Sequence, residues 1–339
     1  MPVFKQILRR HTLSPIDSGC VLTIGAFDGV HLGHRAILDQ IVVQARSRGM
    51  ESVVLTFEPN PNEFFSRGVP PGRLQSWHEK VESLLAFGID RLVSLAFNDQ
   101  LRALTAEQFL QSILLEGLNA KVLVIGDDFH FGCDRLGNFK MLEEFAQGRG
   151  YEVYPTPTVS IDGSRVSSTR IRNLLEAGDF LAATRLLGRP YSISGRIVRG
   201  EQLGRTLGFP TANIHLKRRR SVMSGVYLVD LEIDGNKHFG VANVGRRPTA
   251  NVLERPLLEV HLLDFEGNLY GKRVKTTFHH KLREEKTFDS IEALQQAIGE
   301  DIKSARLWVD KYQGSEHEHT PNGLQADEKD YSKRLKRER

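Results

Sequence analysis

The sequence predicts two domains: an α/β domain with a doubly wound parallel sheet, then a small antiparallel β-barrel with a long packed helix. Three observations carry this prediction. In the first half of the chain, short apolar runs alternate with segments of helical periodicity. From about residue 190 onward, short alternating strands and glycine turns follow one another, and no long helix is predicted before about residue 290. An apolar stripe at helical spacing after residue 290 predicts the packed helix.

The composition is that of a globular protein without a membrane span. The chain has 339 residues, 40% hydrophobic and 26% charged, which is enough for two domains with full cores. It contains no apolar run of ~18 residues, and its N-terminus lacks the apolar stretch of a secretory signal. The two cysteines, Cys20 and Cys133, match no metal or disulfide spacing. We therefore expect a cytoplasmic protein that makes no membrane contact.

The net charge does not indicate a nucleic-acid partner. The formal charge is +4, but residues 328–339 hold six Lys or Arg and three Asp or Glu, so this segment supplies +3 of it. The rest of the chain is close to neutral, unlike a nucleic-acid-binding surface. Residues 314–339 are polar and have few apolar side chains to bury, so we expect them to be disordered. The sequence does not indicate an oligomeric state.

The first domain is organised around residues 25–34. The apolar run 20–24 predicts a buried strand, and helical spacing follows the run, so His31 and His34 lie in the first turn of a helix and on one face of it. Gly33 lets a ligand approach the backbone, and the free N–H groups of a helix start attract anions. The segment therefore suits phosphate. Alone, His-x-Gly-His fits better with a helix start that carries two solvated histidines.

Three further segments of the first half are unusual. Residues 58–62 and 126–132 each follow a predicted strand, and carboxyl ends of parallel strands share one edge of a sheet. The proline loop 58–62 could also be a plain connecting turn. Residues 166–172, Val-Ser-Ser-Thr-Arg-Ile-Arg, combine hydroxyls, free helix N–H groups and an arginine, which suits a polyphosphate. An ordinary helix cap with surface arginines fits those residues equally well.

In the second half, a glycine-rich segment precedes a Pro-Thr-Ala-Asn corner. Its spacing matches neither the Walker pattern nor the dinucleotide fingerprint. Thr211 and Asn213 point the same way if the chain is extended there. A hydroxyl and an amide oxygen on one face could bind Mg²⁺, although an Asx-type turn is the simpler interpretation of these two residues.

Together and in order, these motifs resemble those of a known enzyme family. Residues 25–34 resemble the flavin-nucleotide branch of the His-x-Gly-His nucleotidyltransferases, and so do the proline loop and the Gly-Asp-Asp-Phe-x-Phe-Gly string of residues 126–132. The glycine segment with Pro-Thr-Ala-Asn is very similar to riboflavin kinase. The chain is thus identified as resembling the bifunctional riboflavin kinase/FMN adenylyltransferase family, the prokaryotic FAD synthetases.

For residues 1–187, the resemblance implies a Rossmann-like nucleotidyltransferase that joins FMN to the α-phosphorus of ATP and releases pyrophosphate. It implies His31, His34 and Arg172 as catalytic residues. The implied ATP-binding residues are Gly25, Phe27, Asp28, Gly29, Ser167 and Thr169. The implied flavin-binding residues are Pro59, Pro61 and Asp128, although some relatives have an amide at the last position.

For residues 188–313, the resemblance implies a barrel of riboflavin kinase type that transfers the γ-phosphate of Mg-ATP to riboflavin. Glu259 matches the general base of that family, and Thr211 and Asn213 match its metal ligands. The glycines implied to cover ATP are Gly195, Gly200, Gly204 and Gly208. The implied partners are small molecules: riboflavin, FMN, FAD and ATP, with Mg²⁺ or a similar cation. Two alternatives stay open, a nucleotidyltransferase with another acceptor and a non-enzymatic flavin- or RNA-binding protein.

Overall fold

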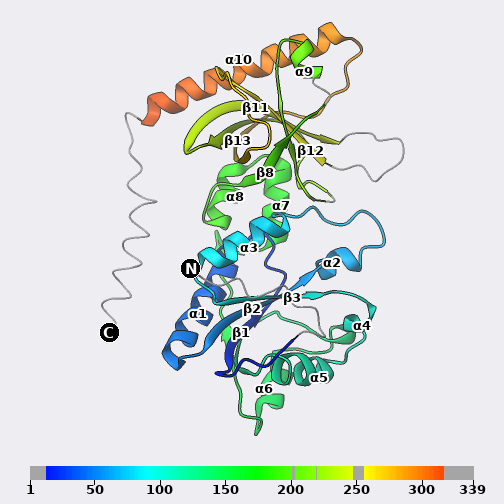
Figure 1. The fold of residues 1–339 in the computed structure, drawn as a ribbon, viewed down its shortest axis with the longest axis vertical. Coiled ribbons are helices and arrows are strands. Elements are labelled where there is room, and N and C mark those ends of the chain that lie inside the picture. Colours follow the sequence, from blue (N-terminus) through cyan, green and yellow to red (C-terminus); the bar gives the residue numbers. More distant parts are fainter. Residues whose placement is uncertain (1–12, 201–202, 219, 247–255, 317–339) are drawn as a thin grey trace.

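A computed structural model describes residues 13–200, 203–218, 220–246 and 256–316 (Figure 1). The α/β part lies at one end of the molecule and the barrel at the other, with α7 (Ser168–Ala177) and α8 (Phe180–Leu187) between them. Among the described residues, none of the helices is long and apolar enough to span a membrane.

The first half forms a five-stranded sheet in the order β3-β2-β1-β4-β5, with all its strands parallel. The strands are β1 (Cys20–Ile24), β2 (Glu51–Glu58), β3 (Arg91–Ala96), β4 (Ala120–Gly126) and β5 (Glu152–Thr156). The small hairpin β6 (Ser160–Ile161) and β7 (Ser164–Arg165) stands apart from this sheet. Because β1 lies between β2 and β4, the segments 25–34, 58–62 and 126–132 leave neighbouring strands at the same edge, as predicted.

Helices cover both faces of the sheet, which confirms the doubly wound prediction. One apolar cluster joins alternate residues of the strands to α1 (Leu32–Arg48) and α3 (Trp77–Ala86), and a second joins the other face to α5 and the elements that follow it. The remaining helices of this half are α2 (Pro61–Phe64), α4 (Asp99–Arg102), α5 (Ala106–Phe109), the π-helical turn η2 (Leu110–Leu115), the 3₁₀ turn η3 (Cys133–Arg135) and α6 (Phe139–Ala146).

The second half forms the predicted antiparallel barrel. Six strands close it in the order β10-β11-β12-β9-β8-β13. They are β8 (Ser192–Val198), β9 (Ala212–His215), β10 (Gly225–Ile233), β11 (Asn236–Arg246), β12 (Pro256–Leu262) and β13 (Arg273–Arg283). The short helix α9 (Leu203–Thr206) lies within the glycine-rich segment.

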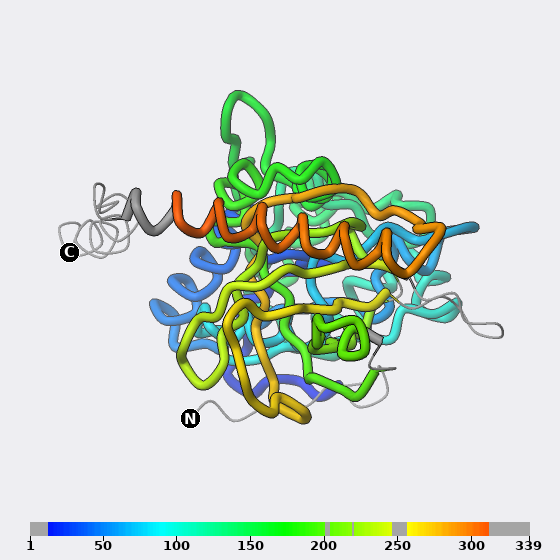
Figure 2. The backbone as a smooth tube through the Cα atoms, turned by 90° about the horizontal axis from the view of Figure 1, so that it is seen from above, coloured from blue at the N-terminus to red at the C-terminus, as the bar shows by residue number. Residues whose placement is uncertain are grey.

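The long helix α10 (Ile291–Glu316) packs on the outside of the barrel through an apolar stripe that includes Ala305. It lies across the end of the barrel farthest from the parallel sheet (Figure 2). The helix includes the first three residues of the segment expected to be disordered, and residues 317–339 lie outside the described part of the chain.

The two halves share an apolar cluster. Side chains of α7 and α8, such as Ile171 and Phe180, pack with barrel residues such as Tyr227 and Phe278. The predicted boundary at residue 187/188 stays a prediction, and in the folded chain the two helices before it are packed against the barrel.

Candidate active sites

The turn between β1 and α1 brings the two predicted histidines together. His31 caps α1, and its Nδ1 accepts a hydrogen bond from the backbone N–H of His34, with 3.3 Å between the nitrogens. The two rings stack with 3.7 Å between their centroids. The Phe27 ring lies 5.0 Å from that of His34. Since Nδ1 of His31 is an acceptor, a neutral His31 ring carries its proton on Nε2 and can donate it to an anion.

This turn has a strained backbone. Phe27 and Val30 have positive φ angles of 48° and 38°, a region that side chains rarely adopt, and Gly29 has a φ of 91°. A Cβ atom at Gly29 would also lie 2.6 Å from Leu74 Cδ1. Gly29 is therefore required for the shape of the turn. The backbone N–H of Gly25 donates to the Leu55 carbonyl, 3.0 Å away, and holds the start of the turn to the sheet.

Burial keeps both imidazoles neutral. His31 is 5% exposed, and desolvation lowers its pKa to about 4, although the nearby Asp28 carboxylate opposes this shift. Burial and the neighbouring His31 ring also lower the pKa of His34 well below its usual value. Among the described residues, Nδ1 of His34 has no hydrogen-bond partner. A bound ligand could supply that partner.

This burial predicts acid sensitivity. The pKa of His31 is lower in the folded chain than the usual 6.5, so between pH 6.5 and pH 4 the unfolded chain binds more protons and stability falls with pH. His31→Asn keeps a good helix cap and removes the titrating group. When the pH is lowered from 7 to 4.5, we expect the unfolding free energy of the wild type to fall by about 2–3 kcal/mol more than that of the variant. Urea titrations at the two pH values measure this difference. The control is His78→Asn, which changes an exposed histidine. If the unfolding free energies of His31→Asn and wild type fell equally with pH, the lowered pKa of His31 would be contradicted.

Asp28 and Arg172 form a buried pair behind the turn. One carboxylate oxygen of Asp28 lies 2.6 Å from an Arg172 guanidinium nitrogen, and the carboxylate also accepts the backbone N–H groups of Leu74 and Gln75. Nε of Arg172 donates to the Gly72 carbonyl at 2.7 Å. Asp28 is 4% exposed, and these protein donors surround its carboxylate. It therefore anchors Arg172.

The start of α7 lies beside the start of α1. Ser167 caps α7 by accepting the Arg170 N–H, and Ser168 Oγ donates to the Asp28 carbonyl at 2.9 Å. A Cβ atom at Gly33 would lie 3.2 Å from the His31 ring and 3.5 Å from the Val166 carbonyl. Thr169 is exposed. Two helix N-termini therefore converge next to the histidines, and both orient N–H groups that favour an anion.

The predicted flavin residues lie on either side of β1. Pro59 and Pro61 follow β2, and Pro61 is the first residue of α2. Asp128 follows β4, is exposed, and pairs with Arg165 at 2.6 Å, which lowers the pKa of its carboxyl. Next to the proline loop, the rings of Phe57, Phe64, Phe65 and Phe97 form an aromatic cluster. These aromatic faces are suited to a planar ring.

Two cations near the turn were not predicted. The buried Lys80 ammonium donates to the Ala26 carbonyl at 2.8 Å, and burial lowers the pKa of Lys80. Arg189 donates to the carbonyls of Gly29 and Val30, at 2.8 and 3.1 Å. They come from α3 and from the segment after α8, far from the turn in sequence, so no local spacing could indicate them.

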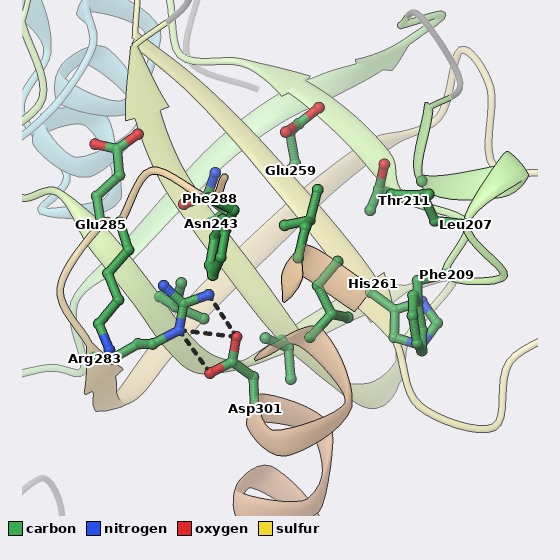
Figure 3. Close-up of a pocket in the computed structure, with 16 residues that line it drawn as sticks. Leu207, Phe209, Thr211, Asn243, Glu259, His261, Arg283, Glu285, Phe288 and Asp301 are labelled. Atoms are coloured by element: carbon green, nitrogen blue, oxygen red, sulfur yellow. Dashed lines mark hydrogen bonds and ion pairs between the residues drawn. The ribbon is translucent and has the colours of Figure 1, made fainter. Parts of the chain in front are cut away.

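The second candidate site is a cavity of about 350 Å³ between the barrel and α10 (Figure 3). Glu259 of β12 pairs in register with Asn213 on one neighbouring strand and Asn243 on the other, so the three side chains share a face. In Figure 3 the Glu259 carboxylate and the Thr211 hydroxyl lie on one side of the cavity, and the Arg283–Asp301 ion pair lies on the other. The apolar lining residues are Leu207, Phe209, Val226, Val241, Phe288, Leu294 and Ile298.

Asn213 meets the requirement for an oxygen ligand. The residue is 5% exposed, and its Oδ1 is buried without a hydrogen-bond partner among the described residues. A buried, unpaired amide oxygen is costly unless something binds it. Because Mg²⁺ prefers oxygen ligands, the residues present fit this cation.

The structure gives a different reason for glycine at each of the four predicted positions. A Cβ atom at Gly200 would lie 2.6 Å from the Asn213 amide, and one at Gly204 would lie 2.5 Å from the Phe209 carbonyl. Gly195 lies against Ile214 in the barrel wall, and Gly208 has a φ of 84° in a turn with open space around it. Gly200 and Gly204 therefore let the glycine segment approach the candidate metal ligands closely.

Two family models match the chain, one in each half. A family model for FAD synthetase matches residues 13–170, and one for riboflavin kinase matches residues 187–309. A Pseudomonas fluorescens protein named bifunctional riboflavin kinase/FMN adenylyltransferase is 50% identical over 296 residues, covering 87% of this chain and 95% of its own length. The chain belongs to this family. An Escherichia coli (strain K12) protein of the same name is 42% identical over 298 residues, with the same two coverages, 87% and 95%.

A solved structure also shares the fold over most of the chain. It is described as a macrolide-efflux protein from Streptococcus pneumoniae, and it superposes with a TM-score of 0.73 at 30% sequence identity. The match covers 88% of this chain and 98% of that one. The histidine turn lies within the residues matched by the FAD synthetase model, and the cavity beside Glu259 lies within those matched by the riboflavin kinase model.

Proposed function

We propose that this enzyme phosphorylates riboflavin to FMN in residues 188–313 and then adenylylates FMN to FAD in residues 1–187, releasing pyrophosphate. The observation that carries the proposal is the presence of two separate sites in one chain. One is a histidine pair where two helices begin, and the other is a cavity lined by Thr211 and Glu259. Asn213, with its unpaired oxygen, is the partner of Glu259 on the neighbouring strand.

In adenylyl transfer, an oxygen of the FMN phosphate attacks the α-phosphorus of ATP, and the bond from that phosphorus to the bridging oxygen breaks. No protein nucleophile is needed, so catalysis consists of positioning and charge stabilisation. Neutral His31 and His34 donate hydrogen bonds to the charge that develops on the α-phosphate and the leaving group. Arg172, held by Asp28, binds the β,γ end together with Ser167 and Thr169.

The other predicted residues of this site have supporting roles. Gly25, Phe27 and Gly29 shape the turn against which ATP lies. Pro59, Pro61 and Asp128 line the flavin side, next to the aromatic cluster at the end of β2. This assignment is supported by the adjacent positions of β1, β2 and β4 in the sheet.

In the kinase reaction, the Glu259 carboxylate takes the proton of the riboflavin 5′-hydroxyl. The hydroxyl oxygen attacks the γ-phosphorus of ATP, and ADP leaves. Thr211 and Asn213 would hold Mg²⁺, which neutralises phosphate charge when bound. The glycine segment, with Gly195, Gly200, Gly204 and Gly208, covers ATP. The apolar part of the cavity takes the flavin ring. We also propose a cytoplasmic location, supported by Cys20 and Cys133, which are both free thiols.

Product analysis tests this function. The purified chain, incubated with riboflavin, ATP and Mg²⁺, is expected to form FMN and then FAD, separable by chromatography. A chelator should stop phosphorylation, and added Mg²⁺ should restore it. Supplying FMN with CTP in place of ATP tests for a nucleotidyltransferase of another specificity. A product formed with CTP and not with ATP would contradict the proposal. Absence of both flavin products would do the same.

A further inference from the structure

Residues 72–76, which lead into α3, connect the two halves of the molecule. Their backbone makes hydrogen bonds toward the histidine site. The N–H groups of Leu74 and Gln75 donate to the Asp28 carboxylate, with distances of 3.1 and 3.2 Å, and the Gly72 carbonyl accepts from Nε of Arg172 at 2.7 Å. This segment therefore forms one wall of the site that holds the Asp28–Arg172 pair.

Two further carbonyls of the same segment are bound from the kinase half. The Arg73 carbonyl accepts from Arg218 at 3.2 Å, and the Leu74 carbonyl accepts from the Tyr191 hydroxyl at 3.2 Å. Arg218 also donates to the Tyr191 hydroxyl at 2.9 Å. A Cβ atom at Gly72 would lie 2.7 Å from the Ser221 carbonyl, so the barrel side touches the segment directly.

This connection is buried and most of its polar atoms are hydrogen-bonded, although Nε of Arg218 has no partner among the described residues. The Arg218 side chain has no exposed surface, and Tyr191 is 3% exposed. The buried guanidinium is neutralised by Glu79, 2.6 Å away, which also accepts the backbone N–H groups of Ser76 and Ser194. Because the hydrogen bonds of this buried network are directional, the network favours one geometry. A shift of the barrel residues would therefore move the segment that holds Asp28 and Arg172.

We propose that Tyr191 and Arg218, which belong to the kinase half, are positioning residues for adenylyl transfer. They fix residues 72–76, which in turn fix Asp28 and the Arg172 guanidinium at the β,γ end of ATP. Neither residue touches a substrate. The inference rests on the function proposed for the histidine site.

The variant that tests this role is Tyr191→Phe. It keeps the ring that packs beside Phe278 and removes only the hydroxyl between Arg218 and the Leu74 carbonyl. Loss of a neutral hydrogen bond predicts a rise of about fivefold in KM for ATP in FAD formation from supplied FMN. KM for FMN and the rate of FMN formation from riboflavin are expected to stay unchanged. This selectivity separates positioning from a general loss of stability, because Tyr191 lies in the half that makes FMN.

Glu82→Gln is the matched control. It breaks the exposed Glu82–Arg273 pair, 2.7 Å, which also links the two halves but does not touch residues 72–76, so both reactions should be unaffected. The inference is overturned if Tyr191→Phe leaves KM for ATP unchanged, raises KM for FMN equally, or slows both reactions alike. Arg218→Met removes the cation that neutralises the buried Glu79 and can prevent folding, so the decisive variant is Tyr191→Phe. If the wild-type chain forms no FAD, the proposed function fails instead.

Discussion

A variant carrying both His31→Ala and His34→Ala is expected to convert riboflavin to FMN and to make no detectable FAD. In the proposed reaction, each substitution removes a neutral donor to the reacting phosphate, and loss of one such donor typically costs about 10²–10³ in kcat. The kinase cavity lies in the other half of the chain and keeps its residues. Chromatography of a reaction with riboflavin, ATP and Mg²⁺ should therefore show FMN accumulating.

The single variants separate structure from chemistry. His31→Ala also removes the acceptor that caps α1, which is worth about 1 kcal/mol of stability, so His34→Ala is the cleaner test. The control is His78→Ala, an exposed histidine of the same half, which should leave both products unchanged. If a folded double variant lost FMN and FAD together, the assignment of the histidines to the second reaction would be wrong.

Asn213→Ala is expected to have the opposite effect. The substitution removes the buried, unpaired oxygen that would bind Mg²⁺ with Thr211, and phosphoryl transfer depends on neutralising the charge of ATP. We expect FMN formation to fall by about 10²-fold or more. Adenylylation of supplied FMN should continue at its normal rate. Initial rates of the two reactions, measured separately on the same preparation, check both halves of this prediction.

A matched variant is available on the barrel surface. Asn236→Ala changes an exposed asparagine at the turn between β10 and β11 and should leave FMN formation intact. Titration of Mg²⁺ adds a second measurement, because a lost ligand raises the cation concentration needed for half-maximal rate. Unchanged FMN formation with an unchanged Mg²⁺ requirement in Asn213→Ala would exclude Asn213 as a ligand.

Apolar patterns predicted most of the fold. Strand β1 has the bounds predicted for it, residues 20–24, because its apolar run is followed directly by Gly25. Strand β5 was not predicted, since Pro155 interrupts its pattern, and a proline is tolerated there at the sheet edge. Strand β9 was not predicted either, because its first residues belong to the Pro-Thr-Ala-Asn segment, which was interpreted as a corner.

The sites were predicted less completely, for a physical reason. Sequence spacing relates residues within one helix or strand, so the contact between His31 and His34 could be predicted. Lys80 and Arg189 reach the same turn from other elements, and only the tertiary fold brings them there. Asp28 was predicted to bind ATP, and the structure surrounds its carboxylate with protein donors. Its assignment to ATP stays a prediction.

The packing of α7 and α8 on the barrel gives a physical reason why the two activities remain in one polypeptide. The Phe180 ring packs against the rings of Tyr227 and Phe278, with 5.8 and 6.0 Å between centroids, and Ile171 and Leu175 belong to the same cluster. If the gene were split at the predicted boundary, each of the two polypeptides would expose an apolar surface prone to aggregation. Separation into two genes would first need polar replacements on both surfaces, so mutual burial, besides the peptide bond, keeps the tandem enzyme fused.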